Sequence, residues 1–212
     1  MKTIIIIHWF NYWKTENKKE FLYLINKLKK QKLNVILFEY EDRPNNLNKI
    51  LENLNKVIIN TQSDNITLIG FSLGSYISIK YLEKYKNKNI KKIILCVPLV
   101  NGSKFFRTIY KIYPNWIKYS GKVIHDASYE KLNYNKIPKN IDVSVIRGYK
   151  RINRRIISIF AQILFLGKKN DGLFTISETN FGKKIITLNI GHYESPYSPM
   201  IADSIIKIIQ KD

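Results

Sequence analysis

Thr67-Leu68-Ile69-Gly70-Phe71-Ser72-Leu73-Gly74-Ser75-Tyr76-Ile77 is the stretch that decides how this chain folds. It opens with an apolar run short enough for a buried strand, and after Ser72 it enters a helical pattern of apolar side chains. Gly-x-Ser-x-Gly joins the two parts without a break. Glycines two residues before and after a serine let neighbouring segments approach closely, because they carry no Cβ. The stretch therefore predicts a buried strand, a sharp turn and a helix in direct succession.

Ser72, at the tip of this turn, is a candidate nucleophile. A residue in such a turn adopts a strained backbone conformation that lifts its side chain clear of the sheet. The N–H of Leu73 would then lie at a helix N-terminus, where it could stabilise an oxyanion. The alternative is a glycine-rich turn with a passive serine. A strand directly before the motif and a helix directly after it favour the nucleophile.

Six short apolar runs have the length and composition of buried strands. They are Thr3–Ile7, Asn34–Phe38, Ile66–Phe71, Lys92–Val97, Val143–Arg147 and Lys184–Leu188. Amphipathic helical patterns lie between the first four runs, and another follows the last. This alternation predicts an α/β fold, in which a compact, mostly parallel six-stranded sheet carries helices on both faces. Ligands bind such sheets at the carboxyl ends of the strands.

The 212 residues suit one domain with a full core, and no linker or change of composition divides them. No stretch approaches the roughly 20 apolar residues of a membrane-spanning helix. The apolar run within Met1–Trp9 is short for a secretion signal and lacks a small-residue cleavage site. Cys96 is the only cysteine and lies in an apolar run, which favours an inert core residue in a reducing compartment. We therefore expect a single domain over residues 1–212 and a cytoplasmic location.

The formal net charge of +20 could indicate attraction to phosphate groups. The lysines are spread over the whole chain together with many Ile and Asn residues, a pattern also typical of biased codon composition. No nucleic-acid recognition motif accompanies the charge, so a nucleic-acid partner is not expected. Peripheral contact with an anionic membrane stays open, and the basic stretches Lys104–Lys122 and Arg147–Arg155 are the candidates for it.

His8, Trp9 and Phe10 follow the first expected strand. With the serine turn, this arrangement resembles the α/β-hydrolase superfamily, in which a His-Gly-aromatic or His-Gly-Leu segment at this place supplies an N–H to the oxyanion hole. The resemblance implies that the backbone N–H of Phe10 acts together with that of Leu73. Trp9 stands where the family has glycine, and its bulk narrows the conformations open to the loop. The alternative is that Trp9 and Phe10 only cap the core.

A serine nucleophile of this kind needs a base and a carboxylate that orients the base. Residues 168–175 contain an Asn-Asp-Gly-hydrophobic pattern that resembles the acid-bearing loop of lipase-like members, which implies Asp171 as the acid. Asp142 competes with it, but lies at the start of a strand and thus at the wrong edge of the sheet. Asp126 falls in the segment from Lys104 to Asn140, which is expected to form a cap over the site, and Glu178 is a weaker alternative.

The chain has three histidines, so few candidates for the base exist. His8 matches the oxyanion segment, and His125 lies in the presumed cap. His192 follows the last strand after a glycine, where this superfamily carries its base. The order Ser, Asp, His, with each residue after a strand, favours His192 as the base.

The segment from Lys104 to Asn140 interrupts the regular alternation of strands and helices. It combines basic residues with many aromatic rings, which crowd its first half: Phe105, Phe106, Tyr110, Tyr113, Trp116 and Tyr119. An insertion at this place commonly forms a cap over the active site in the superfamily. The resemblance therefore implies a small aromatic cap at about residues 104–140, in which Phe105, Phe106 and Trp116 bind substrate together with Trp9. The alternative is a pair of ordinary surface helices that bury these rings.

Taken together, the resemblance covers nearly the whole chain and implies a serine hydrolase of the lipase and esterase type that cleaves a small-molecule or lipid ester. It implies no cofactor and no metal, since the histidines are few and dispersed. A thioesterase or acyltransferase would use the same catalytic groups. A catalytically silent hydrolase-like module that binds an anionic membrane surface is the alternative outside enzymes.

Overall fold

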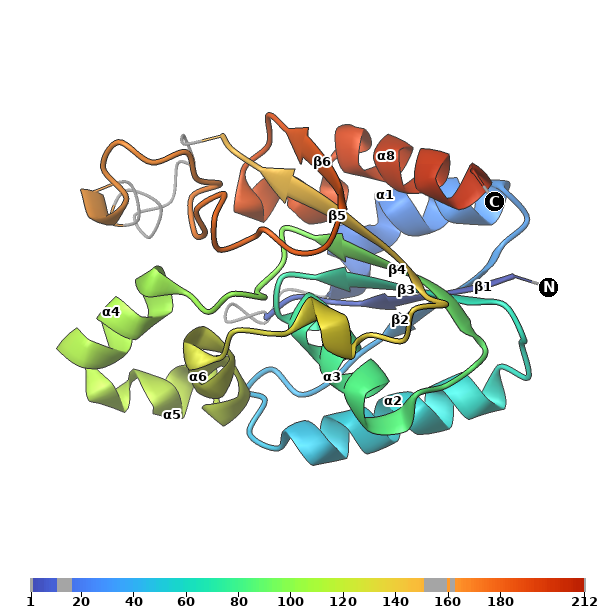
Figure 1. Ribbon diagram of the computed structural model, residues 1–212, viewed down its shortest axis with the longest axis horizontal. Coiled ribbons are helices and arrows are strands. Elements are labelled where there is room, and N and C mark those ends of the chain that lie inside the picture. Colours follow the sequence, from blue (N-terminus) through green and yellow to red (C-terminus); the bar gives the residue numbers. More distant parts are fainter. Residues whose placement is uncertain (1, 11–16, 151–159, 161–162, 212) are drawn as a thin grey trace.

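The computed structural model describes residues 2–10, 17–150, 160 and 163–211 of the chain. These residues form a six-stranded sheet between two layers of helices (Figure 1). The strands are β1 (Thr3–Ile7), β2 (Asn34–Phe38), β3 (Ile66–Phe71), β4 (Ile90–Cys96), β5 (Asp142–Gly148) and β6 (Lys184–Leu188). Their order in the sheet is β2-β1-β3-β4-β5-β6, and every neighbouring pair is parallel.

The predicted α/β fold with a parallel sheet is confirmed, and four of the six strands have the predicted bounds. β5 is one residue longer at each end. β4 begins two residues earlier than expected and ends at Cys96, because Val97 leaves the strand with a φ of 42°. Positive φ in a β-branched residue is rare. This conformation is not visible in an apolar sequence pattern, which explains why the pattern placed the end of the strand one residue too late.

Two pairs of helices cover the sheet (Figure 1). They are α1 (Asn17–Lys30) with α8 (Pro199–Gln210), and α2 (Leu47–Asn60) with α3 (Leu73–Tyr85). Alternate residues of a strand face opposite helical layers. In β1, Ile5 and Ile7 pack in the cluster under α2 and α3, and Ile4 and Ile6 pack in the cluster under α1 and α8. This alternation follows from the two-residue period of a strand.

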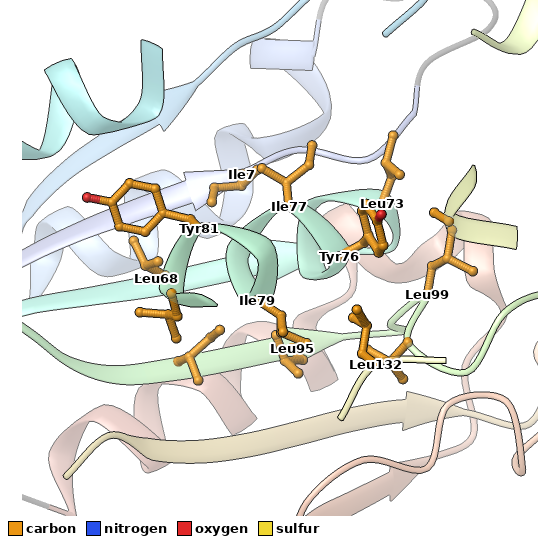
Figure 2. Close-up of a cluster of buried hydrophobic side chains, with 14 of the residues drawn as sticks. Ile7, Leu68, Leu73, Tyr76, Ile77, Ile79, Tyr81, Leu95, Leu99 and Leu132 are labelled. Carbon is orange, nitrogen blue, oxygen red and sulfur yellow. The ribbon is translucent and has the colours of Figure 1, made fainter. Parts of the chain in front are cut away.

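Helix α3 begins directly after Ser72 and packs across the middle of the sheet (Figure 2). Its residues Ile77 and Tyr81 lie over β1 and β3, where they contact the cluster that contains Ile7 and Leu68. Each fully buried side chain of this size contributes about 1.5–3 kcal/mol to stability. The helix that follows the serine is therefore fixed by the largest core of the molecule.

A helical segment leaves the carboxyl end of β4 and lies beyond that edge of the sheet (Figure 1). It consists of α4 (Lys104–Ile112), η1 (Pro114–Trp116), α5 (Ile117–Ser120), α6 (Lys122–Tyr129) and η2 (Tyr134–Lys136). Ser103 caps α4 by accepting a hydrogen bond from the Phe106 N–H at 3.2 Å. Val123 donates its N–H to the Pro44 carbonyl at 2.9 Å, which ties α6 to the loop after β2.

Cys96 is fully buried at the end of β4, and burial raises the pKa of its thiol. Among the described residues, no helix combines the length and apolar character needed to cross a membrane. Of the predicted basic stretch at residues 147–155, positions 151–155 lie outside the described residues.

Candidate active site

Ser72 occupies the strand-to-helix turn between β3 and α3 with φ 50° and ψ −112°. A Cβ on Gly74 would lie 2.2 Å from the Ile7 carbonyl oxygen, and one on Gly70 would lie 2.6 Å from the Gly74 oxygen. Real side chains do not approach backbone atoms this closely. The two glycines of the motif are therefore required by the packing of β1, β3 and α3 around the serine.

Backbone hydrogen bonds hold this turn in place. Ser72 donates its N–H to the Cys96 carbonyl at 2.9 Å and accepts the Leu99 N–H at its own carbonyl at 3.3 Å. The Ser75 hydroxyl donates to the Gly70 carbonyl at 2.7 Å. These bonds to β4 and to the first turn of α3 stabilise a backbone conformation that is otherwise unfavourable.

His192 lies within hydrogen-bond distance of the serine. It opens the short helix η3 (His192–Tyr197) after β6, and its Nε2 is 3.0 Å from Ser72 Oγ. The turn before it is fixed by Glu194, whose carboxylate accepts the Gly191 N–H at 3.2 Å and pairs with Lys150 at 2.8 Å. These contacts lower the pKa of Glu194, so its charge is maintained beside the turn.

Asp171 lies on the other side of the imidazole. Its Oδ2 is 2.9 Å from His192 Nδ1, and its Oδ1 accepts the N–H groups of Leu173 at 2.9 Å and Phe174 at 2.8 Å. Its backbone carbonyl also accepts the His192 N–H at 2.7 Å. Asp171 is 0% exposed, and three donors around one carboxylate provide the stabilisation that a buried charge requires. The arrangement can hold the Nδ1–H tautomer of His192, which leaves Nε2 free to accept a proton.

Gly148, at the end of β5, brings the acid and base loops together, and sequence reasoning missed it. A Cβ at this position would lie 2.4 Å from the Ile190 carbonyl oxygen and 3.1 Å from Asp171 Cβ. Its φ is not positive, so the requirement is close approach alone. A glycine that ends a strand on the carboxyl edge was the available signal for such a contact.

The other candidate acids have local partners. Asp142 pairs with Lys184 at 2.6 Å at the amino end of β5, the edge opposite the serine, as predicted. Asp126 pairs with Lys122 at 2.9 Å on α6, where it also contacts His125. Glu178 accepts the N–H and hydroxyl of Thr175 at 2.8 Å and the N–H of Lys104, so it links the loop after Asp171 to the start of α4. Neither Asp142 nor Asp126 takes the place of Asp171.

Trp9 is both a core residue and a neighbour of His192. Its side chain is buried, its indole N–H donates to Glu20 at 2.8 Å, and its ring faces the His192 ring at 6.1 Å with 23° between the planes. Trp9 is absent from the described residues with positive φ, so position 9 does not require the backbone freedom of glycine. Tyr193 contacts both rings edge-on, and this neighbour was missed by the sequence analysis.

The residues predicted to bind substrate differ in their surroundings. The Phe106 ring lies 6.3 Å from the Phe174 ring, and Phe174 meets the His192 ring edge-on at 4.8 Å, so one ring separates Phe106 from His192. Phe105 is only 2% exposed and packs against Phe106 and Phe160 behind this wall, and its place in substrate binding stays a prediction. Trp116, in η1, contacts Tyr119 at 6.1 Å, and its place in substrate binding stays a prediction.

The geometry joins a hydroxyl, an imidazole and a carboxylate in one chain of hydrogen bonds, an arrangement that can activate the hydroxyl for attack on a carbonyl carbon. Within the described part of the chain, no group of three or more His, Cys, Asp or Glu side chains is placed to hold a metal ion.

No family model and no curated protein matches the chain. Solved structures do: a metagenomic carboxyl esterase matches with a TM-score of 0.78 and 12% identity over 100% of this chain and 76% of its own. The Bacillus licheniformis lipase BlEst2 matches with a TM-score of 0.73 and 14% identity over 98% of this chain and 91% of its own. A meta-cleavage product hydrolase from Pseudomonas fluorescens matches with a TM-score of 0.66 and 11% identity over 100% and 91%. The chain has the α/β-hydrolase fold.

Proposed function

We propose that the protein is a serine hydrolase that cleaves carboxylic esters through Ser72, His192 and Asp171. The observation that carries the proposal is the hydrogen-bonded chain from Ser72 Oγ to His192 Nε2 at 3.0 Å and from His192 Nδ1 to Asp171 Oδ2 at 2.9 Å. Ser72 and His192 are 120 positions apart in the sequence, and Asp171 and His192 are 21 apart. All three side chains are at least nine-tenths buried. A purely structural explanation does not require the strained serine between two obligatory glycines.

The reaction proceeds in two stages. His192 Nε2 takes the proton of Ser72 while Oγ attacks the ester carbonyl, and the imidazolium that forms is stabilised by Asp171. The oxyanion of the tetrahedral intermediate accepts hydrogen bonds from the backbone N–H groups of Leu73 and Phe10. Collapse of the intermediate breaks the carbonyl–oxygen bond, and His192 gives its proton to the leaving alcohol. Water, deprotonated by His192, then attacks the acyl-enzyme, and the acid leaves as Ser72 regains its proton.

An ester is the favoured substrate because the fold neighbours include a carboxyl esterase and a lipase. The rings of Trp9 and Phe174, which contact His192, and of Phe106, which contacts Phe174, also give the site an apolar surface. Thioesters and acyl transfer need the same groups. Hydrolysis rates over a panel of aryl esters and thioesters distinguish an esterase from a thioesterase. An acyltransferase would turn over appreciably only when an alcohol or amine acceptor is supplied.

Labelling with a fluorophosphonate probe tests the proposal. We expect a single adduct on Ser72 that is absent in Ser72→Ala and strongly reduced in His192→Ala. Ser204→Ala and His125→Ala are the matched controls: Ser204 bonds its own helix α8, and His125 lies on α6, so both variants should label like the native protein. A folded native sample that does not label would contradict the proposal and favour a silent binding module.

A further inference from the structure

His8 is a buried histidine that takes no direct part in the proposed reaction. Its side chain lies between the end of β1 and the chain after β2, and its ring stacks on Tyr40 at 4.1 Å with 7° between the planes. Nε2 is 3.2 Å from the Tyr40 backbone N–H, and Nδ1 is hydrogen-bonded to the Trp9 carbonyl. Both ring nitrogens of His8 therefore have a hydrogen-bond partner close to the candidate active site.

These two contacts decide the tautomer of the imidazole. A backbone N–H can only donate, so Nε2 must accept and carries no proton. A carbonyl oxygen can only accept, so Nδ1 carries the proton and donates it to Trp9. Burial lowers the pKa of His8 to about 4, against smaller opposite effects of the hydrogen bond to Trp9, the charge of Asp42 and the hydrogen bond to Tyr40. The neutral ring is therefore the form present near neutral pH.

The bond to Trp9 also fixes the direction of the neighbouring N–H. The carbonyl of Trp9 and the N–H of Phe10 belong to one planar trans peptide, in which the two groups point to opposite sides. A side chain that holds the carbonyl on one side therefore holds the Phe10 N–H on the other. Phe10 is one of the two proposed oxyanion donors.

The same segment lies against the serine turn. Gly74, on the first turn of α3, has room for no side chain because a Cβ there would lie 2.7 Å from the His8 carbonyl oxygen. The Tyr40 hydroxyl donates to that His8 carbonyl at 3.0 Å. The backbone of His8 is thus held between Tyr40 and the helix that carries the other donor, Leu73.

We propose that His8 is a positioning residue of the oxyanion hole, which orients the Trp9–Phe10 peptide by donating from Nδ1 to the Trp9 carbonyl. The inference rests on the proposed function, since it assigns His8 a task within that site. It distinguishes His8 from an ordinary core histidine, whose removal would affect folding but not the rate of the chemical step.

Three substitutions at this position test the inference with p-nitrophenyl acetate as the probe. His8→Phe keeps a ring against Tyr40 but cannot donate, and we expect kcat to fall roughly 10- to 100-fold with KM changed less than about threefold. His8→Asn places an amide N–H near the position of Nδ1 and should keep kcat within about threefold of the native value. His8→Gln extends its polar group toward the position of Nε2 and should lose kcat as His8→Phe does; it also serves if His8→Phe does not fold.

A second measurement follows the oxyanion directly. A trifluoromethyl ketone that forms a tetrahedral adduct with Ser72 should bind more weakly to His8→Phe by the same factor by which kcat/KM falls. Native turnover in folded His8→Phe or His8→Gln would overturn the inference. Equal losses in His8→Asn and His8→Phe would also overturn it, because they indicate packing alone.

Ser72→Ala, measured in the same series, separates this inference from the proposed function. If Ser72→Ala hydrolyses the ester as fast as the native protein, the proposed function fails and the role of His8 fails with it. If Ser72→Ala is inactive while His8→Phe turns over at the native rate, only the inference about His8 fails.

Discussion

At the scale of single residues, Asp171 offers the sharpest test of how the base is oriented. Its two oxygens accept three hydrogen bonds, two from the backbone N–H groups of Leu173 and Phe174 and one from His192. Asp171→Asn has one carbonyl oxygen, so its NH2 group would face His192 Nδ1 or the backbone donors. The first placement forces the imidazole into the tautomer that cannot take the proton of Ser72. We expect kcat to fall about 10⁴-fold.

Steady-state hydrolysis of an aryl ester measures this loss, with Asp126→Asn as the matched control. Asp126 is exposed and pairs with Lys122 on α6, so its substitution should leave kcat within about twofold of the native value. Activity of Asp171→Asn within about tenfold of the native protein would contradict the proposed assignment of the acid. Glu178→Gln would then be the next variant to assay.

His8 also makes a prediction about stability and pH. Its pKa is lowered from 6.5 to about 4 in the folded protein, mainly by burial. Between these values the unfolded chain binds a proton that the folded chain does not, so stability is fully present above pH 6.5 and is lost as pH falls toward 4. The full loss is about 3 kcal/mol. The free energy of unfolding, measured with urea at several pH values, should fall as the pH decreases from 6.5 to 4, and it should fall less steeply in His8→Asn. An equally steep fall in both proteins would contradict the prediction.

At the scale of the elements, substitution of a glycine in the serine turn should lower stability and activity, because backbone atoms of other segments lie close to it. Gly74→Ala would place a Cβ 2.2 Å from the Ile7 carbonyl oxygen, so β1 and α3 must move apart. Overpacking of this kind costs about 1–3 kcal/mol. Gly167→Ala is the control, because Gly167 has a φ of +78° but no atom within 4 Å of an added Cβ. Its cost comes from backbone strain alone, about 1 kcal/mol.

The two variants separate in activity more than in stability. Thermal unfolding should show losses in both, whereas kcat should fall strongly only in Gly74→Ala. The reason is that β1 leads into Phe10 and α3 begins with Leu73, the two proposed oxyanion donors. Gly167→Ala should turn over at the native rate. Full activity in Gly74→Ala would show that the turn can relax without disturbing the site.

The elements themselves were largely readable from the sequence because each follows a local rule. Apolar runs gave the strands, the three-to-four-residue period gave α1, α2, α3 and α8, and Gly70, Ser72 and Gly74 identified the turn. The position of His192 followed from the end of β6. Contacts between distant segments were not readable: Gly148 looked like an ordinary strand end, although it admits Ile190 and Asp171. The burial of Phe105 also depends on tertiary packing, which an aromatic composition does not specify.

At the scale of the whole molecule, the fold collects the candidate active site at one edge. The loops after β1, β3 and β6 meet at the carboxyl ends of the strands, and α4 to α6 lie beyond the same edge (Figure 1). The end of α4 and the residue after it expose Ile112 at 69% and Tyr113 at 47%, and Lys111 of α4 and Lys118 of α5 are exposed in the same part of the chain. An apolar tip flanked by cations suits the surface of an anionic membrane.

The net charge of +20 predicts some attraction to any anionic surface, so a matched pair of variants is needed to show that this tip directs it. Lys111→Glu with Lys118→Glu changes the tip, whereas Lys88→Glu with Lys91→Glu makes the same charge change at the opposite edge, where β4 begins. A lysine near the membrane surface contributes about 1 kcal/mol. Loss of two lysines from the tip should therefore weaken partition onto phosphatidylserine vesicles by about 2 kcal/mol, or roughly 30-fold, and repulsion of the two new glutamates adds to this loss.

Vesicle co-sedimentation at two salt concentrations measures this effect. Binding of the native protein should fall as NaCl rises from about 0.1 to 0.5 M, because the screening length shortens. The Lys88 and Lys91 pair should retain binding within about threefold, since those side chains lie at the far edge and would face away from a membrane that the tip contacts. Equal losses in both pairs would mean that the charge acts without orientation. If the native protein does not bind phosphatidylserine vesicles, the many lysines have no role in membrane contact, and ester substrates would reach Ser72 from solution.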